Sequence, residues 1–115
     1  MNEYLLIYKG GDPDFHQKNP EVICAIMERW GAWFKKLEAE DKLVNGGAPL
    51  HFAGKRISKD FVVTDIAAAE LKELVSGYTI IKAENLEDAV ELAKGCPIFE
   101  SPIINVEVRE ILKLS

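Results

Sequence analysis

Residues 76–97 read SGYTIIKAENLEDAVELAKGCP and contain the signals of a strand and of the helix that follows it. The segment 76–83 is rich in β-branched and aromatic residues, which favours a strand. Asn85 has the side chain of a helix N-cap, because its oxygen can accept a backbone N–H. Apolar residues then recur at helical spacing until Gly95, and Pro97 prevents the helix from continuing. The stretch predicts a strand followed by a short amphipathic helix.

The segments on either side of this unit read as strands. After it, INVEVR (residues 104–109) alternates strictly between apolar and polar side chains, which predicts a strand with one buried face. Before it, KRIS (residues 55–58) and DFVVTD (residues 60–65) predict a hairpin that turns around Ser58-Lys59. The short stretch between Asp65 and the strand at 76–83 carries helix-forming residues but is too short to be a stable helix alone.

The N-terminal half follows the same order of a strand and then a helix. EYLLIY (residues 3–8) predicts a strand, and Asn19-Pro20 predicts the start of an amphipathic helix that runs to about Asp41. VNGGAPL (residues 44–50) reads as a loop because of its glycines and proline. The sequence therefore predicts a single domain over residues 1–115, an α+β fold of the ferredoxin-like βαββαβ type with an extra hairpin.

Composition narrows the possible partners. The net charge is −5 with no basic stripe, which argues against a nucleic-acid binder. No segment approaches the ~20 apolar residues of a membrane span, and the short N-terminal apolar run does not suit a signal peptide. Cys24 and Cys96 have no metal-ligand spacing, so we expect reduced thiols, no metal and no cofactor. We therefore expect a cytoplasmic protein.

Two helices leave one face of such a sheet uncovered. We predict that Leu5 and Ile7 face the helices, whereas Tyr4, Leu6 and Tyr8 face away. Other residues predicted on the uncovered face are Tyr78, Ile80, Lys82, Asn105, Glu107 and Arg109. A face that mixes aromatic and aliphatic side chains usually finds a partner, so we expect a homodimer with two-fold symmetry. The alternative is a monomer with a half-solvated sheet.

The whole chain resembles the YCII-related proteins, in particular the branch marked by an Asp-Gly-Pro-Phe motif. The segments that carry the resemblance, in order, are EYLLIY, the tryptophan-containing helix, GGAPL, TD followed by ELKE, SGYTII, LEDAVELAKGCP and VEVR. The resemblance implies a ferredoxin-like α+β fold that dimerises into an α/β barrel with a cleft between the protomers. The motif itself is degenerate here, because Asp65 is followed by Ile66, Ala67 and Ala68. A related branch has a proposed His–Asp pair with the histidine on the first helix, where this chain has Arg29 or Trp30.

The candidate site residues are polar groups expected near that cleft. Asp65 and Glu107 are candidate catalytic acids or bases, since a carboxylate at the edge of a cleft can move a proton. Asp65 is alternatively the N-cap of the short stretch that follows it. Glu107 and Arg109 are alternatively an ion pair between subunits. No metal site is expected at His16 or His51, which read as surface residues.

The candidate ligand-binding residues are Arg29, Trp30, Tyr78 and Arg109. Either arginine suits a carboxylate ligand, because a guanidinium matches the geometry of that group. Trp30 is alternatively a core residue of the first helix. We expect the pocket between the first helix, residues 65–73 and the uncovered sheet face.

Two functions fit these observations. The first is a homodimer that binds a small polar or anionic molecule in the cleft between its subunits, with acid–base catalysis as its enzymatic form. The second is a non-catalytic accessory or regulatory protein that acts through protein–protein contacts. The degenerate motif and the lack of a histidine on the first helix favour the second.

Overall fold

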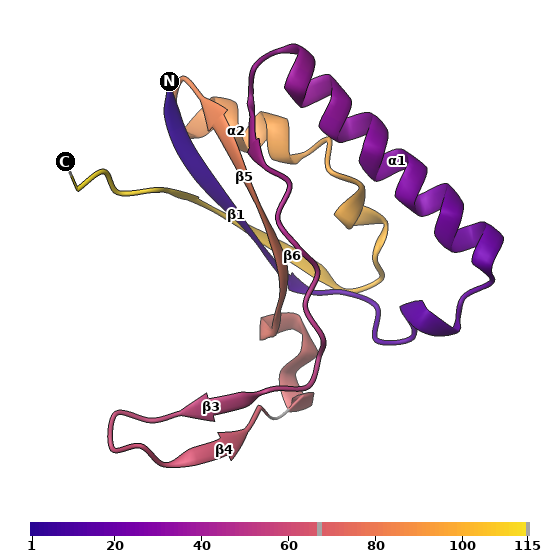
Figure 1. Ribbon diagram of the computed structural model, residues 1–115, viewed down its shortest axis with the longest axis vertical. Helices are drawn as coiled ribbons and strands as arrows, with labels where there is room; N and C mark the ends of the chain where they lie inside the picture. The colour runs from indigo at the N-terminus through magenta and orange to yellow at the C-terminus, as the bar shows by residue number, and fades with distance from the viewer. Residues whose placement is uncertain (67, 115) are drawn as a thin grey trace.

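The computed structural model describes residues 1–66 and 68–114, and all of their side chains except those of residues 68–70. Its main sheet has four strands: β1 (Asn2–Gly10), β2 (Leu43–Asn45), β5 (Val75–Ala83) and β6 (Ile104–Glu110). Their order is β2-β5-β1-β6, with antiparallel neighbours throughout. Two helices, α1 (Pro20–Ala39) and α2 (Leu86–Ala93), contribute to one core with this sheet (Figure 1). This α+β arrangement is compatible with a ferredoxin-like fold.

Both helices begin at the asparagines that the sequence singles out. Asn19 accepts a hydrogen bond from the Glu21 backbone N–H at 2.8 Å, and Asn85 accepts one from the Asp88 backbone N–H at 2.9 Å. Each bond satisfies one of the N–H groups that the first turn of a helix leaves without a partner. Both predicted helix starts are therefore confirmed.

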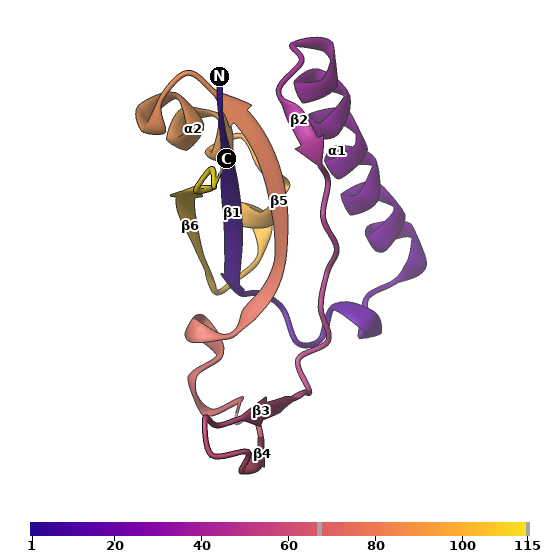
Figure 2. The ribbon, with the colours of Figure 1, turned by 60° about the vertical axis from the view of Figure 1, so that its left-hand side comes forward.

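The predicted hairpin is also confirmed, as a unit separate from the main sheet. β3 (Lys55–Ile57) and β4 (Val63–Asp65) pair antiparallel and project beyond the end of the main sheet (Figures 1 and 2). Short 3₁₀-helices occur at η1 (Phe15–Gln17), η2 (Ala68–Glu73) and η3 (Pro97–Glu100). In the described part of the chain, no helix has the length and apolar character needed to cross a membrane.

The second strand of the main sheet is not where the sequence suggests it. β2 is a three-residue edge strand that pairs with β5, and its last two residues lie in the segment 44–50 that the sequence predicts to be a loop. Three residues are too few to show an alternating pattern, and the Asn45-Gly46-Gly47 sequence looks like a turn. The Thr79 hydroxyl donates to the Gly46 carbonyl at 3.1 Å and holds this loop on the sheet. A Cβ on Gly47, whose φ is +76°, would overlap the Tyr78 carbonyl, so glycine is required there.

The predicted orientation of β1 is wrong. Tyr4, Leu6 and Tyr8 are buried in the core beneath the helices, whereas Leu5 and Ile7 are half-buried on the opposite face. Both faces of this strand are apolar, so alternation alone does not show which one meets the helices. Burial of the tyrosines is possible because each hydroxyl has a partner. Tyr8 donates to the Thr79 hydroxyl at 2.7 Å, and Tyr4 donates to the Glu110 carboxylate at 3.3 Å.

The core combines aromatic side chains on α1 with small ones on α2. Trp33 and Leu37 are buried on α1, and Trp30 packs edge-on against both Tyr8 and Trp33. On α2 the fully buried positions are alanines 89 and 93, which let that helix lie close to the sheet. Cys96 is buried and free, whereas Cys24 is free and exposed on α1.

Two substitutions on α1 test this packing. Leu37 is 1% exposed and Met27 is 57% exposed, although helical spacing places both on the apolar side. We expect Leu37→Ala to lower the free energy of unfolding by about 2–5 kcal/mol, because it leaves a cavity. We expect Met27→Ala to change it by no more than about 0.5 kcal/mol. Urea unfolding followed by circular dichroism measures both, and equal costs would contradict the packing of α1.

Candidate functional site

One face of the main sheet is left open by both helices. We call it the open face: Glu3, Leu5, Ile7, Lys9, Tyr78, Ile80, Lys82, Asn105, Glu107 and Arg109. Side chains on neighbouring strands form rows across it. Leu5 lies between Ile80 and Arg109, and the next row has Ile7 between Tyr78 and Glu107. Because directly opposed side chains lie on the same face, these rows bring aliphatic, aromatic and charged groups together.

Glu107 lies in a hollow at one end of the open face. Its carboxylate is 2.9 Å from the Lys9 ammonium, and the side chains of Lys72, Glu73 and Asn105 complete a hollow of about 490 Å³. Arg109 makes no ion pair within the described residues and stays exposed beside Leu5. The open face therefore carries one engaged carboxylate and one guanidinium available to an anion.

Asp65 lies apart from these residues, at the end of β4. Its carboxylate is ion-paired with Lys55 across the hairpin and is 80% exposed. η2 begins at Ala68, three residues after Asp65, and within the described residues the Asp65 carboxylate contacts Lys55. Of the degenerate motif, Ala67 lies outside the described residues, and so does the side chain of Ala68.

Arg29 and Trp30 lie on the helical side of the sheet, opposite the open face. Arg29 donates to the Glu100 carboxylate from its Nε atom, 2.8 Å from Oε2, and from its Nη2 atom, 2.5 Å from Oε1. These hydrogen bonds lower the pKa of Glu100 below its ordinary value. Trp30 is half-buried between Tyr8, Trp33 and Phe34, as its core alternative predicts.

The sequence-selected residues therefore fall into three places. Tyr78, Glu107 and Arg109 share the open face, Arg29 and Trp30 belong to α1, and Asp65 belongs to the projecting hairpin. The sheet separates α1 from the open face, so one chain alone does not form the expected pocket between them. Of these three groups, the open-face residues alone lie together on one face of the sheet.

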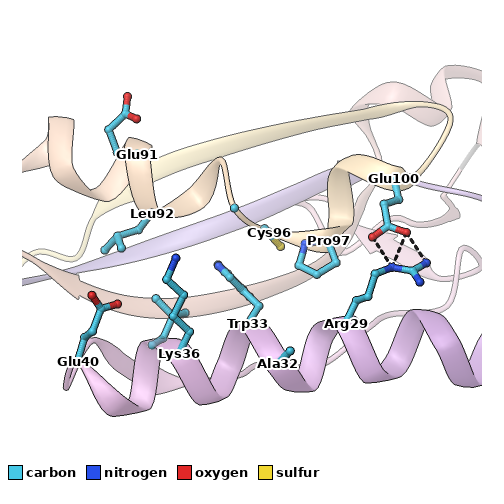
Figure 3. A pocket seen from close by; sticks show the side chains of 12 residues that line it. Arg29, Ala32, Trp33, Lys36, Glu40, Glu91, Leu92, Cys96, Pro97 and Glu100 are labelled. Carbon is cyan, nitrogen blue, oxygen red and sulfur yellow. Dashed lines mark hydrogen bonds and ion pairs between the residues drawn. The ribbon is translucent and has the colours of Figure 1, made fainter.

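A second hollow, which sequence reasoning missed, lies between α1 on one side and α2 with η3 on the other (Figure 3). We call it the interhelical groove, and its volume is about 490 Å³. Buried Cys96 lies at its base, 3.4 Å from the Tyr8 hydroxyl. Burial raises the pKa of the Cys96 thiol to about 11, so the thiol is uncharged at neutral pH and is a poor nucleophile. The spacing between two helices cannot be read from periodicity, which explains why no pattern predicted the groove.

The two histidines, predicted to be separate surface residues, lie near each other. Their ring centroids are 6.3 Å apart, because the loops that carry His16 and His51 meet at one end of the sheet. Both side chains are exposed. Within the described residues, no group of three or more His, Cys, Asp or Glu side chains is arranged to hold a metal ion.

Comparison with known proteins identifies the family. The family model of the YCII-related domain matches residues 4–115, which is nearly the whole chain. No curated protein matches the sequence. The match extends from within β1 past the end of β6, and the chain belongs to the YCII-related family.

Proposed function

We propose that the protein is a homodimer that stacks the open faces of two sheets and binds a small polar or anionic molecule in the cleft between them. The observation that carries this proposal is the composition of the open face. Leu5, Ile7, Tyr78 and Ile80 form a half-buried apolar centre, and Arg109 stands beside it without an ion pair in the described chain.

The apolar centre supports the dimer. In an isolated subunit, water contacts all four of these side chains, and removing that contact stabilises an assembly by roughly 25 cal/mol per Å² of apolar surface. A second copy of the sheet offers the matching surface, because a two-fold interface brings the same residues together from both sides. Two sheets stacked face to face lie about 10 Å apart, which leaves room for side chains of this size.

Arg109 supports an anionic ligand. Stacking the sheets removes water from its guanidinium, and a buried charge without a partner is costly. Glu107, the carboxylate on the same face of β6, is already engaged by Lys9 at 2.9 Å. A ligand carboxylate or phosphate supplies the missing charge and accepts two parallel hydrogen bonds from the guanidinium.

If the protein is an enzyme, we propose that it transfers a proton to or from the ligand bound in the cleft. Glu107 is the candidate base or acid that lies on the open face, in the same hollow as Lys72 and Glu73. Asp65 takes part only if the projecting hairpin of one subunit reaches the cleft of the dimer. Proton transfer requires the acid or base to approach a bound ligand within hydrogen-bond distance.

The second candidate is a non-catalytic accessory protein that acts through protein–protein contacts. The hairpin favours it, because Ile57, Phe61, Val62 and Val63 expose more than half of their surface there. Exposed apolar groups that lie close together often mark an interaction surface. A homodimer that binds none of the anions used below would favour this candidate over the first.

The dimer is tested by placing a charge at the centre of the open face. Ile80→Glu would bring two carboxylates into the stacked interface, so we expect it to be monomeric. Sedimentation equilibrium should give twice the chain mass of 12.9 kDa for the wild type and the single mass for the variant. The matched control is Leu86→Glu, at a 47% exposed position on the helical side, and it should remain dimeric. A wild-type protein that stays monomeric at high concentration would refute the proposal.

Ligand binding in the cleft is tested at Arg109. Citrate and inorganic phosphate should raise the melting temperature of the wild type, because a ligand at about 100 times its Kd adds about 2.7 kcal/mol of stability. We expect Arg109→Leu to lose most of this shift while remaining a dimer. Arg56→Leu, on the exposed strand β3, serves as the control and should keep it. The cleft assignment fails if both variants respond as the wild type does.

A further inference from the structure

The interhelical groove is a second candidate site, independent of the proposed dimer. It lies on the helical side of the sheet, whereas the proposed cleft lies on the open face. Its volume of about 490 Å³ falls in the range of ligand pockets, roughly 300–1,000 Å³. Its floor is apolar, formed by the buried side chains of Trp33, Leu37 and Cys96, and Leu92 and Pro97 form part of the facing wall.

Two nitrogen donors project from α1 into this apolar space. Trp33 and Lys36 are three residues apart, so they lie on the same face of the helix. Figure 3 shows the indole nitrogen of Trp33 and the ammonium of Lys36 both directed across the groove toward α2 and η3. Neither group has a hydrogen bond or an ion pair to any described residue.

Of the other charged groups around the groove, Glu40 likewise has no ion pair within the described residues, whereas Arg29, Glu91 and Glu100 are paired. Arg29 and Glu100 close one end by pairing with each other, and Glu91 pairs with Lys94 at 2.9 Å. The groove therefore offers a cation and a neutral N–H side by side, next to an apolar floor. That combination complements a single carboxylate attached to an apolar body.

We propose that the interhelical groove binds a small monocarboxylate with an apolar or aromatic body. The carboxylate accepts hydrogen bonds from the Trp33 indole N–H and the Lys36 ammonium, and the body packs on Leu92 and Pro97. Glu40, which lines the groove without an ion pair in the described chain, repels additional negative charge and so favours a monocarboxylate over a phosphate or a dicarboxylate.

Gly95 keeps the indole nitrogen accessible. A Cβ at this position would lie 3.4 Å from Trp33 Nε1 and 3.5 Å from the Leu92 carbonyl oxygen. The glycine has no positive φ, so an alanine fits the backbone there without conformational strain. Gly95→Ala is therefore a way to crowd the donor without disturbing the helices.

The chain has only two tryptophans, so a ¹⁵N–¹H spectrum resolves the site directly. Phenylacetate is the probe, phenylacetamide is its uncharged analogue, and the Trp30→Phe spectrum assigns the two indole N–H peaks. We expect phenylacetate to shift the Trp33 indole peak in a saturable way and phenylacetamide to bind several-fold more weakly. No shift of the Trp33 peak, or equal binding of the two probes, would overturn the proposal.

Substitutions in and beside the groove test which residues contribute to phenylacetate binding. Lys36→Gln should weaken phenylacetate binding about three- to fivefold, the size expected for an exposed charge pair, and Gly95→Ala should weaken it as well. Lys35→Gln, the neighbouring exposed lysine outside the groove, should leave the affinity unchanged. Equal affinities for Lys36→Gln and Lys35→Gln would refute the assignment of the carboxylate to the groove.

Discussion

A chain of buried hydrogen bonds through the hydroxyl of Tyr8 determines which face of β1 meets the helices. Tyr8 donates to Thr79 on β5 at 2.7 Å, and Thr79 donates to the Gly46 carbonyl after β2 at 3.1 Å. The Cys96 thiol, at the end of α2, donates to the Tyr8 hydroxyl at 3.4 Å. Each of the hydroxyl and thiol groups in this series of hydrogen bonds has a partner, as a buried polar group requires. Four segments distant in sequence are thereby held at one point.

The orientation of β1 has consequences on both sides of the sheet. Once Tyr4, Leu6 and Tyr8 face the helices, Leu5 and Ile7 must face away, because side chains alternate along a strand. The open face therefore carries Leu5 and Ile7, flanked by Glu3 and Lys9, in place of the predicted Tyr4, Leu6 and Tyr8. On the helical side, the same core positions α1 and α2 with a groove between them. The two proposed sites thus lie on opposite sides of the sheet.

Local signals in the sequence were sufficient for much of the fold. The caps at Asn19 and Asn85 are formed by short-range hydrogen bonds, and the hairpin of β3 and β4 depends on adjacent residues. The sequence does not predict β2, because its three residues form a strand only through their hydrogen bonds to β5. The predicted orientation of β1 is wrong because the true one depends on distant hydrogen-bond partners. Glu110 lies 106 residues from Tyr4, and Thr79 lies 71 residues from Tyr8.

The candidate site shows the same division. Alternation along β6 correctly predicts that Glu107 and Arg109 share the open face. That Lys9 is the ion-pair partner of Glu107 follows only from the pairing of β1 with β6, which alternation does not reveal. Lys55 as the partner of Asp65 follows from the register of the hairpin, which the sequence left open. The two donors of the interhelical groove, Trp33 and Lys36, belong to α1, a helix that the sequence predicts correctly. Their common direction across a cavity depends on the distance to α2 and η3, which periodicity does not specify.

The central claim is that a second sheet covers the open face, and hydroxyl-radical footprinting of Tyr78 tests it most directly. Phe61, 83% exposed on the projecting hairpin, provides an internal reference. We expect oxidation of Tyr78, measured by mass spectrometry relative to Phe61, to be strongly suppressed at high protein concentration and to rise on dilution. A ratio that stays constant across the dilution series, with Tyr78 oxidised at every concentration, would contradict the account.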